Sequence, residues 1–132
     1  MLIDTNIFLE ILLEQERCEL CKQFITDNLE ESCISDFSLH SIAVVTFRKN
    51  KANLFSQFIQ DMLPHLDVLT LPKSDYAQIN TVAQSFNLDF DDAYQYSIAK
   101  CYDLKLVTLD KDFKALNDVK VIFLEGEPSP PL

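Results

Sequence analysis

The stretch Met1-Leu-Ile-Asp-Thr-Asn-Ile-Phe-Leu-Glu10 decides how the rest of the chain is interpreted. Three apolar residues, too few for an independent helix, run directly into a polar Asp-Thr-Asn triplet, and a segment with apolar residues at helical spacing follows. This order predicts a short buried strand, a polar turn and an amphipathic helix. In an open α/β sheet, ligands and catalytic groups gather at the carboxyl ends of the strands. Asp4 is therefore the first candidate site residue.

Length and composition predict one globular α/β domain over residues 1–125, followed by a flexible, proline-containing tail at 126–132. The chain has 132 residues, of which 48% are hydrophobic, and 10 of them are Phe, so it can bury a substantial core. Its single glycine, Gly126, excludes the glycine-rich phosphate loops of nucleotide-binding proteins. The net charge of −10 opposes a broad basic surface for nucleic acid. Either nucleic acid is not the ligand, or a cation or a basic partner supplies positive charge.

Two features of the sequence predict a cytoplasmic protein that makes no use of a membrane. No apolar run approaches the ~18 residues that a membrane span needs, and the N-terminus lacks the basic region of a signal peptide.

The four cysteines fit a reducing compartment as thiols. Cys18 and Cys21 have the spacing of zinc ligands, but the chain offers no second pair, which favours two cysteines on one helix face.

Farther along the chain, short apolar strands alternate with helical segments. This alternation predicts a three-layer α-β-α sandwich with a mainly parallel sheet of four to five strands. The expected strands lie at residues 1–3, 32–35, 67–70, 104–108 and 119–123. The expected helices lie at residues 6–16, 18–28, 36–48, 52–63, 74–85 and 91–102, with one helical turn after residue 113.

Acidic side chains recur where this arrangement brings strand ends together. Asp4 and Asp110 each follow a predicted strand, Asp92 begins a helix that approaches the same edge, and Asp91 and Asp112 lie beside them. Crowded carboxylates repel one another unless a cation or protons neutralise them. Their hard oxygen atoms favour Mg²⁺ or Mn²⁺, which can bind a phosphodiester and activate water. The alternative is that these acids are helix caps and turn residues.

Three motifs in order resemble the PIN-domain family across essentially the whole chain. They are Met1–Asn6, Asp91-Asp-Ala-Tyr94 continuing to Ala99, and Leu106–Phe113. The resemblance implies a Mg²⁺-dependent nuclease fold, which the family's toxin ribonucleases use in bacterial toxin–antitoxin pairs. Residue by residue, it implies metal-binding or catalytic roles for Asp4, Asp92 and Asp110, an auxiliary acid at Asp112, and supporting polar roles for Thr5, Asn6 and Thr108.

One position departs from the family's pattern. The family usually carries a Glu early in the helix after the second strand, and here the best register places Ser41 there, next to His40. One residue along a helix turns a side chain by roughly 100°, so His40 is not a simple substitute. Three substitutes stay open: His40 as a ligand or base, Asp36 reaching in, or an oxygen from Asp91 or Asp112. His40 is otherwise an ordinary polar residue near a helix start.

Three hypotheses for function follow. The first is a metal-dependent ribonuclease of the PIN type, the toxin of a toxin–antitoxin pair, with RNA as substrate, an antitoxin as partner and a homodimer as its assembly. The second is a weakened or inactive domain of the same fold that binds RNA or a protein. The third is a phosphatase with Asp4 as nucleophile, which is disfavoured because Asn6 stands where a second Asp would be needed.

Overall fold

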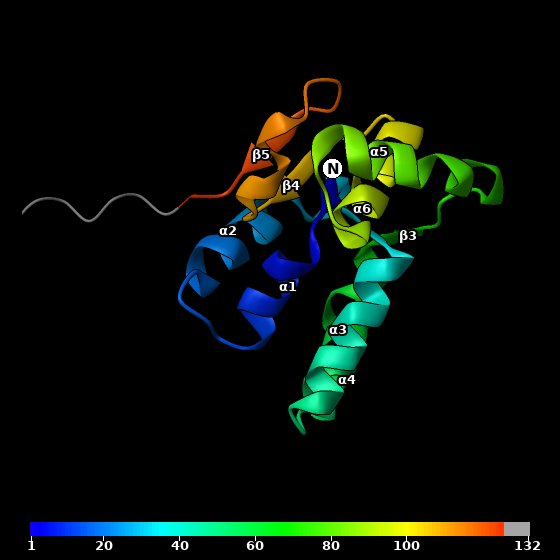
Figure 1. Cartoon of the computed structure of the whole chain (residues 1–132). Helices are drawn as coiled ribbons and strands as arrows, with labels where there is room; N and C mark the ends of the chain where they lie inside the picture. The colour runs from blue at the N-terminus through cyan, green and yellow to red at the C-terminus, as the bar shows by residue number, and fades with distance from the viewer. Residues whose placement is uncertain (126–132) are drawn as a thin grey trace, which may run out of the picture.

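The computed structural model describes residues 1–125, in which five parallel strands form one sheet (Figure 1). The strand order is β3-β2-β1-β4-β5, and every neighbouring pair is parallel. The strands are β1 (Leu2–Ile3), β2 (Cys33–Ser35), β3 (Asp67–Leu69), β4 (Leu106–Thr108) and β5 (Val121–Phe123). The predicted α/β class with a parallel sheet is confirmed. The predicted tail at 126–132 lies outside the described residues.

Helices cover both faces of the sheet, because neighbouring strand residues point to opposite sides. Leu2 packs in one hydrophobic cluster with residues of α5 and α6, whereas Ile3 packs in the other with residues of α1, α2, α3 and α4. The helices are α1 (Thr5–Leu12), α2 (Cys18–Asn28), α3 (Asp36–Arg48), α4 (Ala52–Asp61), α5 (Ile79–Phe86) and α6 (Phe90–Cys101). Among the described residues, no helix is long and apolar enough to cross a membrane.

Short 3₁₀ segments account for most differences from the predicted elements. They are η1 (Leu29–Glu31), η2 (Leu63–His65), η3 (Lys73–Gln78) and η4 (Lys111–Ala115). The helix expected from residue 74 therefore begins as η3 and becomes α-helical only at Ile79. The first helix ends at Leu12 instead of residue 16, since Glu14 has a positive φ of 51°. The Glu10 carboxylate accepts a hydrogen bond from the Arg17 N–H (2.9 Å) and stabilises this early turn.

The order of the strands creates a crevice between β1 and β4. From β1 the chain moves to β2 and β3 on one side, and it then crosses back to place β4 on the other side of β1. Such a switch in direction leaves a crevice at the carboxyl ends of the two strands. Asp4 follows β1 and Asp110 lies just beyond β4, and the Asp4 N–H donates to the Val107 carbonyl (2.9 Å). The fold thus brings both acids to one crevice.

The aromatic contact between α1 and α4 should be a large contributor to stability. Phe8 and Phe58 are almost fully buried, and their rings meet edge to face at 5.4 Å. We expect Phe8→Ala to lower the free energy of unfolding by about 3–5 kcal/mol, because it leaves a cavity in a packed core. Phe47→Ala is the matched control, since that ring is 59% exposed, and should cost less than about 1 kcal/mol. Urea denaturation measures both, and equal losses would contradict the packing.

Candidate metal site

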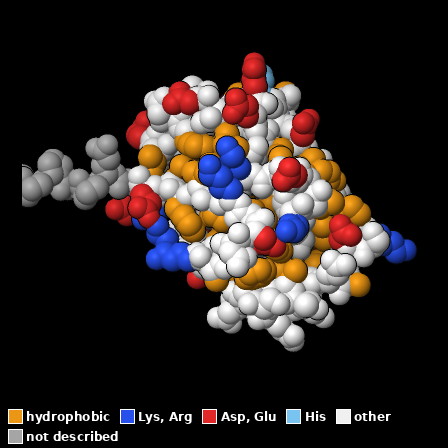
Figure 2. All heavy atoms as spheres, turned by 90° about the horizontal axis from the view of Figure 1, so that it is seen from above, with side chains coloured by type: hydrophobic (Ala, Val, Ile, Leu, Met, Phe, Trp, Pro, Cys, Tyr) orange, Lys and Arg blue, Asp and Glu red, His pale blue; other side chains and the backbone are white. Residues whose placement is uncertain are grey.

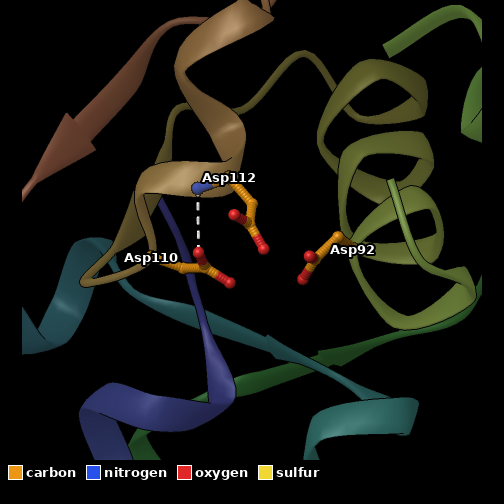
Figure 3. A group of neighbouring side chains, drawn as sticks. All are labelled: Asp92, Asp110 and Asp112. Atoms are coloured by element: carbon orange, nitrogen blue, oxygen red, sulfur yellow. Dashed lines mark hydrogen bonds between the residues drawn. The ribbon is translucent and has the colours of Figure 1, made fainter. Parts of the chain in front are cut away.

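Three carboxylates meet at the crevice (Figure 3). One oxygen of each of Asp92, Asp110 and Asp112 lies within 4.8 Å of the other two, and within the described part of the chain this is the one such group. Asp92 points from the first turn of α6 toward Asp110 and Asp112, which lie at the start of η4. The Asp112 N–H donates to Asp110 Oδ1 (2.8 Å) and holds that carboxylate in place. The structure therefore brings together three of the four predicted metal-binding acids.

Asp4, the fourth acid, is buried beside this cluster, and its carboxylate oxygens accept three hydrogen bonds. Its Oδ1 accepts from the Thr5 N–H (2.9 Å) and from Gln95 Nε2 (3.1 Å), and its Oδ2 accepts from Thr108 Oγ1 (2.7 Å). A carboxylate oxygen has two lone-pair sites, so Oδ1 is filled and Oδ2 keeps one. Asp4 can therefore offer a cation a single oxygen.

The supporting polar residues hold the two strand ends together. Thr108 donates its hydroxyl proton to Asp4 Oδ2 and accepts the Asp110 N–H (2.9 Å), so one side chain positions both acids. The Thr5 hydroxyl forms a 2.7 Å hydrogen bond with that of Ser38. Asn6 is exposed and lines the cavity beside Asp4.

Gln95 is the site residue that the sequence analysis missed. It is only 1% exposed, and its Nε2 donates to Asp4 Oδ1 (3.1 Å) and Ser38 Oγ (2.8 Å). Its Oε1 accepts from Ser35 Oγ (2.6 Å). All of the amide's polar atoms are thus engaged, and its orientation is fixed. The sequence did contain one indication of this role: Gln95 lies three residues after Asp92, which places the two side chains on one side of α6.

A cavity of about 250 Å³ contains the position at which the family's pattern has Glu. Ser41 lines it together with Asp4 and Asp92, whereas His40 is exposed and lies outside the lining. Asp36 accepts the Tyr94 hydroxyl proton (2.6 Å) and is not part of this cavity. The other lining residues are Thr5, Asn6, Leu9, Phe37, Val45, Asp91 and Gln95. Of the substitutes considered for the Glu, the structure places only Asp91 and Asp112 at the site.

The pKa values of the acids show how crowded the cluster is. Burial raises the pKa of Asp4 above its usual range, although hydrogen bonds from Thr108, Gln95 and Thr5 lower it in part. Burial, followed by the charges of Asp110, Asp4 and Asp112, raises the pKa of Asp92 to about 7. At neutral pH the cluster is therefore under electrostatic strain, which a bound cation would relieve.

The donor set fits a hard divalent cation. Asp92, Asp110 and Asp112 would hold it, with the free lone pair of Asp4 Oδ2 beside them, and every donor is a carboxylate oxygen. Such sets favour Mg²⁺ or Mn²⁺ over metals that prefer nitrogen or sulfur.

A larger cavity of about 610 Å³ adjoins the first one and shares Asn6, Leu9 and Val45 with it. Three cationic residues line it, namely Arg17, Lys49 and Lys111. Its acidic lining residues are Glu10, Glu16 and Asp110. Lys111 also pairs with Glu125 and lies over the Phe123 ring. Positive side chains thus approach the acidic cluster from the Asp110 side.

Fold and site together define a parallel α/β protein with a carboxylate cluster at its topological switch point. The sequence matches the family model for the PIN domain over residues 1–119. The chain therefore belongs to the PIN domain family. Among curated proteins, none matches it significantly.

Several solved structures have the same fold, and one of them is described as a toxin–antitoxin complex. A toxin–antitoxin complex from Klebsiella pneumoniae has a TM-score of 0.74 at 21% identity, covering 94% of this chain and 97% of that one. FitAcB from Neisseria gonorrhoeae has a TM-score of 0.73 at 25% identity, covering 92% and 95%. VapBC2 from Rickettsia felis, bound to a DNA fragment of its promoter, has a TM-score of 0.76 at 13% identity, covering 94% and 98%.

The raised pKa of Asp92 predicts a pH-dependent stability of the metal-free protein. Between the ordinary value of 3.8 and about 7, the folded state binds more protons than the unfolded state, so the free energy of unfolding falls as pH rises. Asp92→Asn should flatten this slope. At pH 8 it should stabilise the protein by about 1–3 kcal/mol, allowing for solvent screening, and at pH 4 by almost nothing.

Thermal unfolding in EDTA across this pH range measures the effect. Asp61→Asn is the matched control, because Asp61 is an exposed acid on α4. A variant at Asp92 that loses stability at pH 8 would contradict the electrostatic account.

Proposed function

We propose that this protein is a ribonuclease that depends on Mg²⁺ or Mn²⁺ and hydrolyses RNA phosphodiesters in the cytoplasm. The observation that carries the proposal is the meeting of Asp92, Asp110 and Asp112 beside the anchored Asp4 at the switch-point crevice. Membership in the PIN domain family supports it. A divalent cation bound there would neutralise phosphate charge and lower the pKa of a bound water.

Hydrogen bonds within the chain hold the acidic side chains of the site in position. Thr5, Gln95 and Thr108 hold Asp4 so that one oxygen stays available, and Asp110 is fixed through its own N–H by Thr108 and through Oδ1 by the Asp112 N–H. Side chains held in this way need little reorganisation when a phosphodiester arrives, which is a principal source of catalysis in phosphoryl transfer.

Charge is arranged in a way that suits a polyanionic substrate despite the net −10. On the face shown in Figure 2, Lys and Arg side chains occur in separate groups among acidic and hydrophobic ones. Arg17, Lys49 and Lys111 nevertheless surround the cavity beside Asp110. We propose that the RNA backbone approaches the cluster from this side, where these cations offset the acids.

We further propose that the protein acts as the toxin of a toxin–antitoxin pair and forms a homodimer. The support for an antitoxin partner is the similarity to one structure described as a toxin–antitoxin complex from Klebsiella pneumoniae and to another described as VapBC2 from Rickettsia felis. A net charge of −10 suits a basic partner.

The central test is cleavage of single-stranded RNA by the purified protein with Mn²⁺. Asp4→Asn should reduce the rate at least about 100-fold, because it replaces an anchored carboxylate oxygen at the metal site with a neutral amide. Gel analysis of labelled RNA measures the rate, with EDTA as the metal-free control. Cleavage that survives the Asp4→Asn change would place the activity elsewhere.

A second candidate function rests on Ser41. Since this residue lines the cavity where the family's pattern has Glu, the site has one carboxylate fewer. A domain of this kind would bind RNA or a protein with little cleavage. Failure of the wild-type protein to cleave, together with retained RNA binding, would favour this alternative.

Adding a carboxylate at position 41 tests whether this position belongs to the metal site. Ser41→Glu should tighten Mn²⁺ binding about tenfold or more, because affinity for hard cations rises with the number of charged ligands. His40→Glu is the matched control, since it adds the same charge one residue away on an exposed position. Calorimetry with Mn²⁺ measures both variants. Equal gains from the two would mean that bulk charge, and not ligation at the cavity, changes the affinity.

A further inference from the structure

Four aromatic rings form a continuous group beside the acidic cavity. Tyr94 lies at its centre, with ring centroids at 6.0 Å from Phe37, 6.1 Å from Phe90 and 6.0 Å from Tyr76. Phe37 and Phe90 also meet each other edge to face at 6.3 Å. The rings come from α3, η3 and α6. The group therefore joins α3 and α6, two of the three helices that border the cavity.

Within this group Tyr94 is buried and held by hydrogen bonds, whereas Phe90 is partly exposed to solvent. Tyr94 is 2% exposed, and its hydroxyl donates to Asp36 Oδ1 (2.6 Å) and accepts from the Leu71 N–H (3.2 Å). Phe90, by contrast, is 52% exposed at the first position of α6, two residues before Asp92. Half of a large apolar ring thus faces solvent at the start of the helix that carries Asp92, where it packs on the fixed Tyr94 and on Phe37.

Phe37 connects the aromatic group to the candidate metal site. It lines the cavity that also contains Asp4, Asp91 and Asp92. Phe47 is the contrasting case, because it is also exposed but lies at the far end of α3 and packs against Phe55. Exposure of an aromatic ring is common on protein surfaces. Phe90 differs from Phe47 because it contacts Phe37, which lines the cavity that contains the carboxylates.

We propose that Phe90, supported by Phe37, stacks against an unpaired nucleobase next to the phosphodiester held at the acidic cluster. The proposal rests on the proposed ribonuclease function and adds to it a residue that contacts a base. Bases in single strands are recognised by stacking on aromatic side chains, and paired bases are not available for this contact.

The surrounding charges favour a base over a phosphate at this position. Asp89 and Asp91 are exposed on either side of Phe90 in the sequence, and they would repel a phosphate group. The cations Arg17, Lys49 and Lys111 line the other cavity, on the Asp110 side. Glu10, Glu16 and Asp110 also line that cavity, so its charges balance, whereas only acids flank Phe90 in the sequence. The RNA backbone should therefore follow that cavity while the neutral base turns toward Phe90.

Binding of RNA tests the proposal without relying on cleavage. In an Asp110→Asn background, a fluorescein-labelled single-stranded RNA is titrated with protein and followed by anisotropy. Loss of one base–aromatic stack costs ~1–3 kcal/mol, so Phe90→Ala should weaken binding about 5- to 150-fold. Phe90→Tyr should restore most of the affinity, and Phe47→Ala should leave it unchanged. Duplex RNA should show little difference between the Phe90 variants.

Several results would overturn the proposal. An unchanged affinity for Phe90→Ala would do so, as would equal losses for Phe90→Ala and Phe47→Ala. If Phe90→Ala kept RNA affinity but lowered the mass measured by light scattering, Phe90 would belong to a contact between copies of the chain. If the wild-type protein cleaved RNA and Phe90→Ala matched it, only this inference would fail. A wild-type protein that neither bound nor cleaved RNA would overturn the proposed function as well.

Discussion

The buried Asp4 carboxylate is the interaction on which the arrangement of the crevice depends. It accepts hydrogen bonds from α1, from Gln95 on α6 and from Thr108 at the end of β4, and Thr108 lies 104 residues from Asp4 in the sequence. A buried carboxylate is tolerated only when its oxygens are satisfied. Within the described residues, no buried side-chain nitrogen or oxygen lacks a partner. The same contacts that satisfy Asp4 therefore fix β4 and α6 against β1.

This anchoring explains why the acidic cluster can exist in a stable fold. Asp92 is held near Asp110 and Asp112 although burial and their charges raise its pKa to about 7. The raised pKa values of Asp4 and Asp92 occur at the carboxyl edge of the sheet, whereas buried hydrophobic residues form a cluster on each of its faces. Sites that store electrostatic strain in this way are typical of function and not of stability. Burial of hydrophobic residues in the core offsets the repulsion among the acids in the crevice.

The sequence predicted the sheet and three of its acidic neighbours because those features depend on local pattern. Strand ends and a helix start locate Asp4, Asp110 and Asp92, and parallel topology implies that they converge. Gln95 could not be identified in the same way, since its role depends on how α6 is rotated against β1. The early end of α1 was missed for a local reason, the positive φ of Glu14. The structure resolves the register of α3: Ser41, not His40, faces the cavity.

The region around Ser41 shows how the cavity is built without the additional acid. Ser35, Ser38 and Gln95 form a neutral hydrogen-bonded network that reaches Asp4 directly. A glutamate at position 41 would add a negative charge to a crevice in which Asp92 already has a raised pKa. Its absence lowers repulsion within the metal-free protein and against an approaching phosphate, at the expense of one oxygen ligand for a cation. The sequence of α3 thus gives a less negative site that would offer a cation one oxygen fewer, while the network that orients Asp4 is complete.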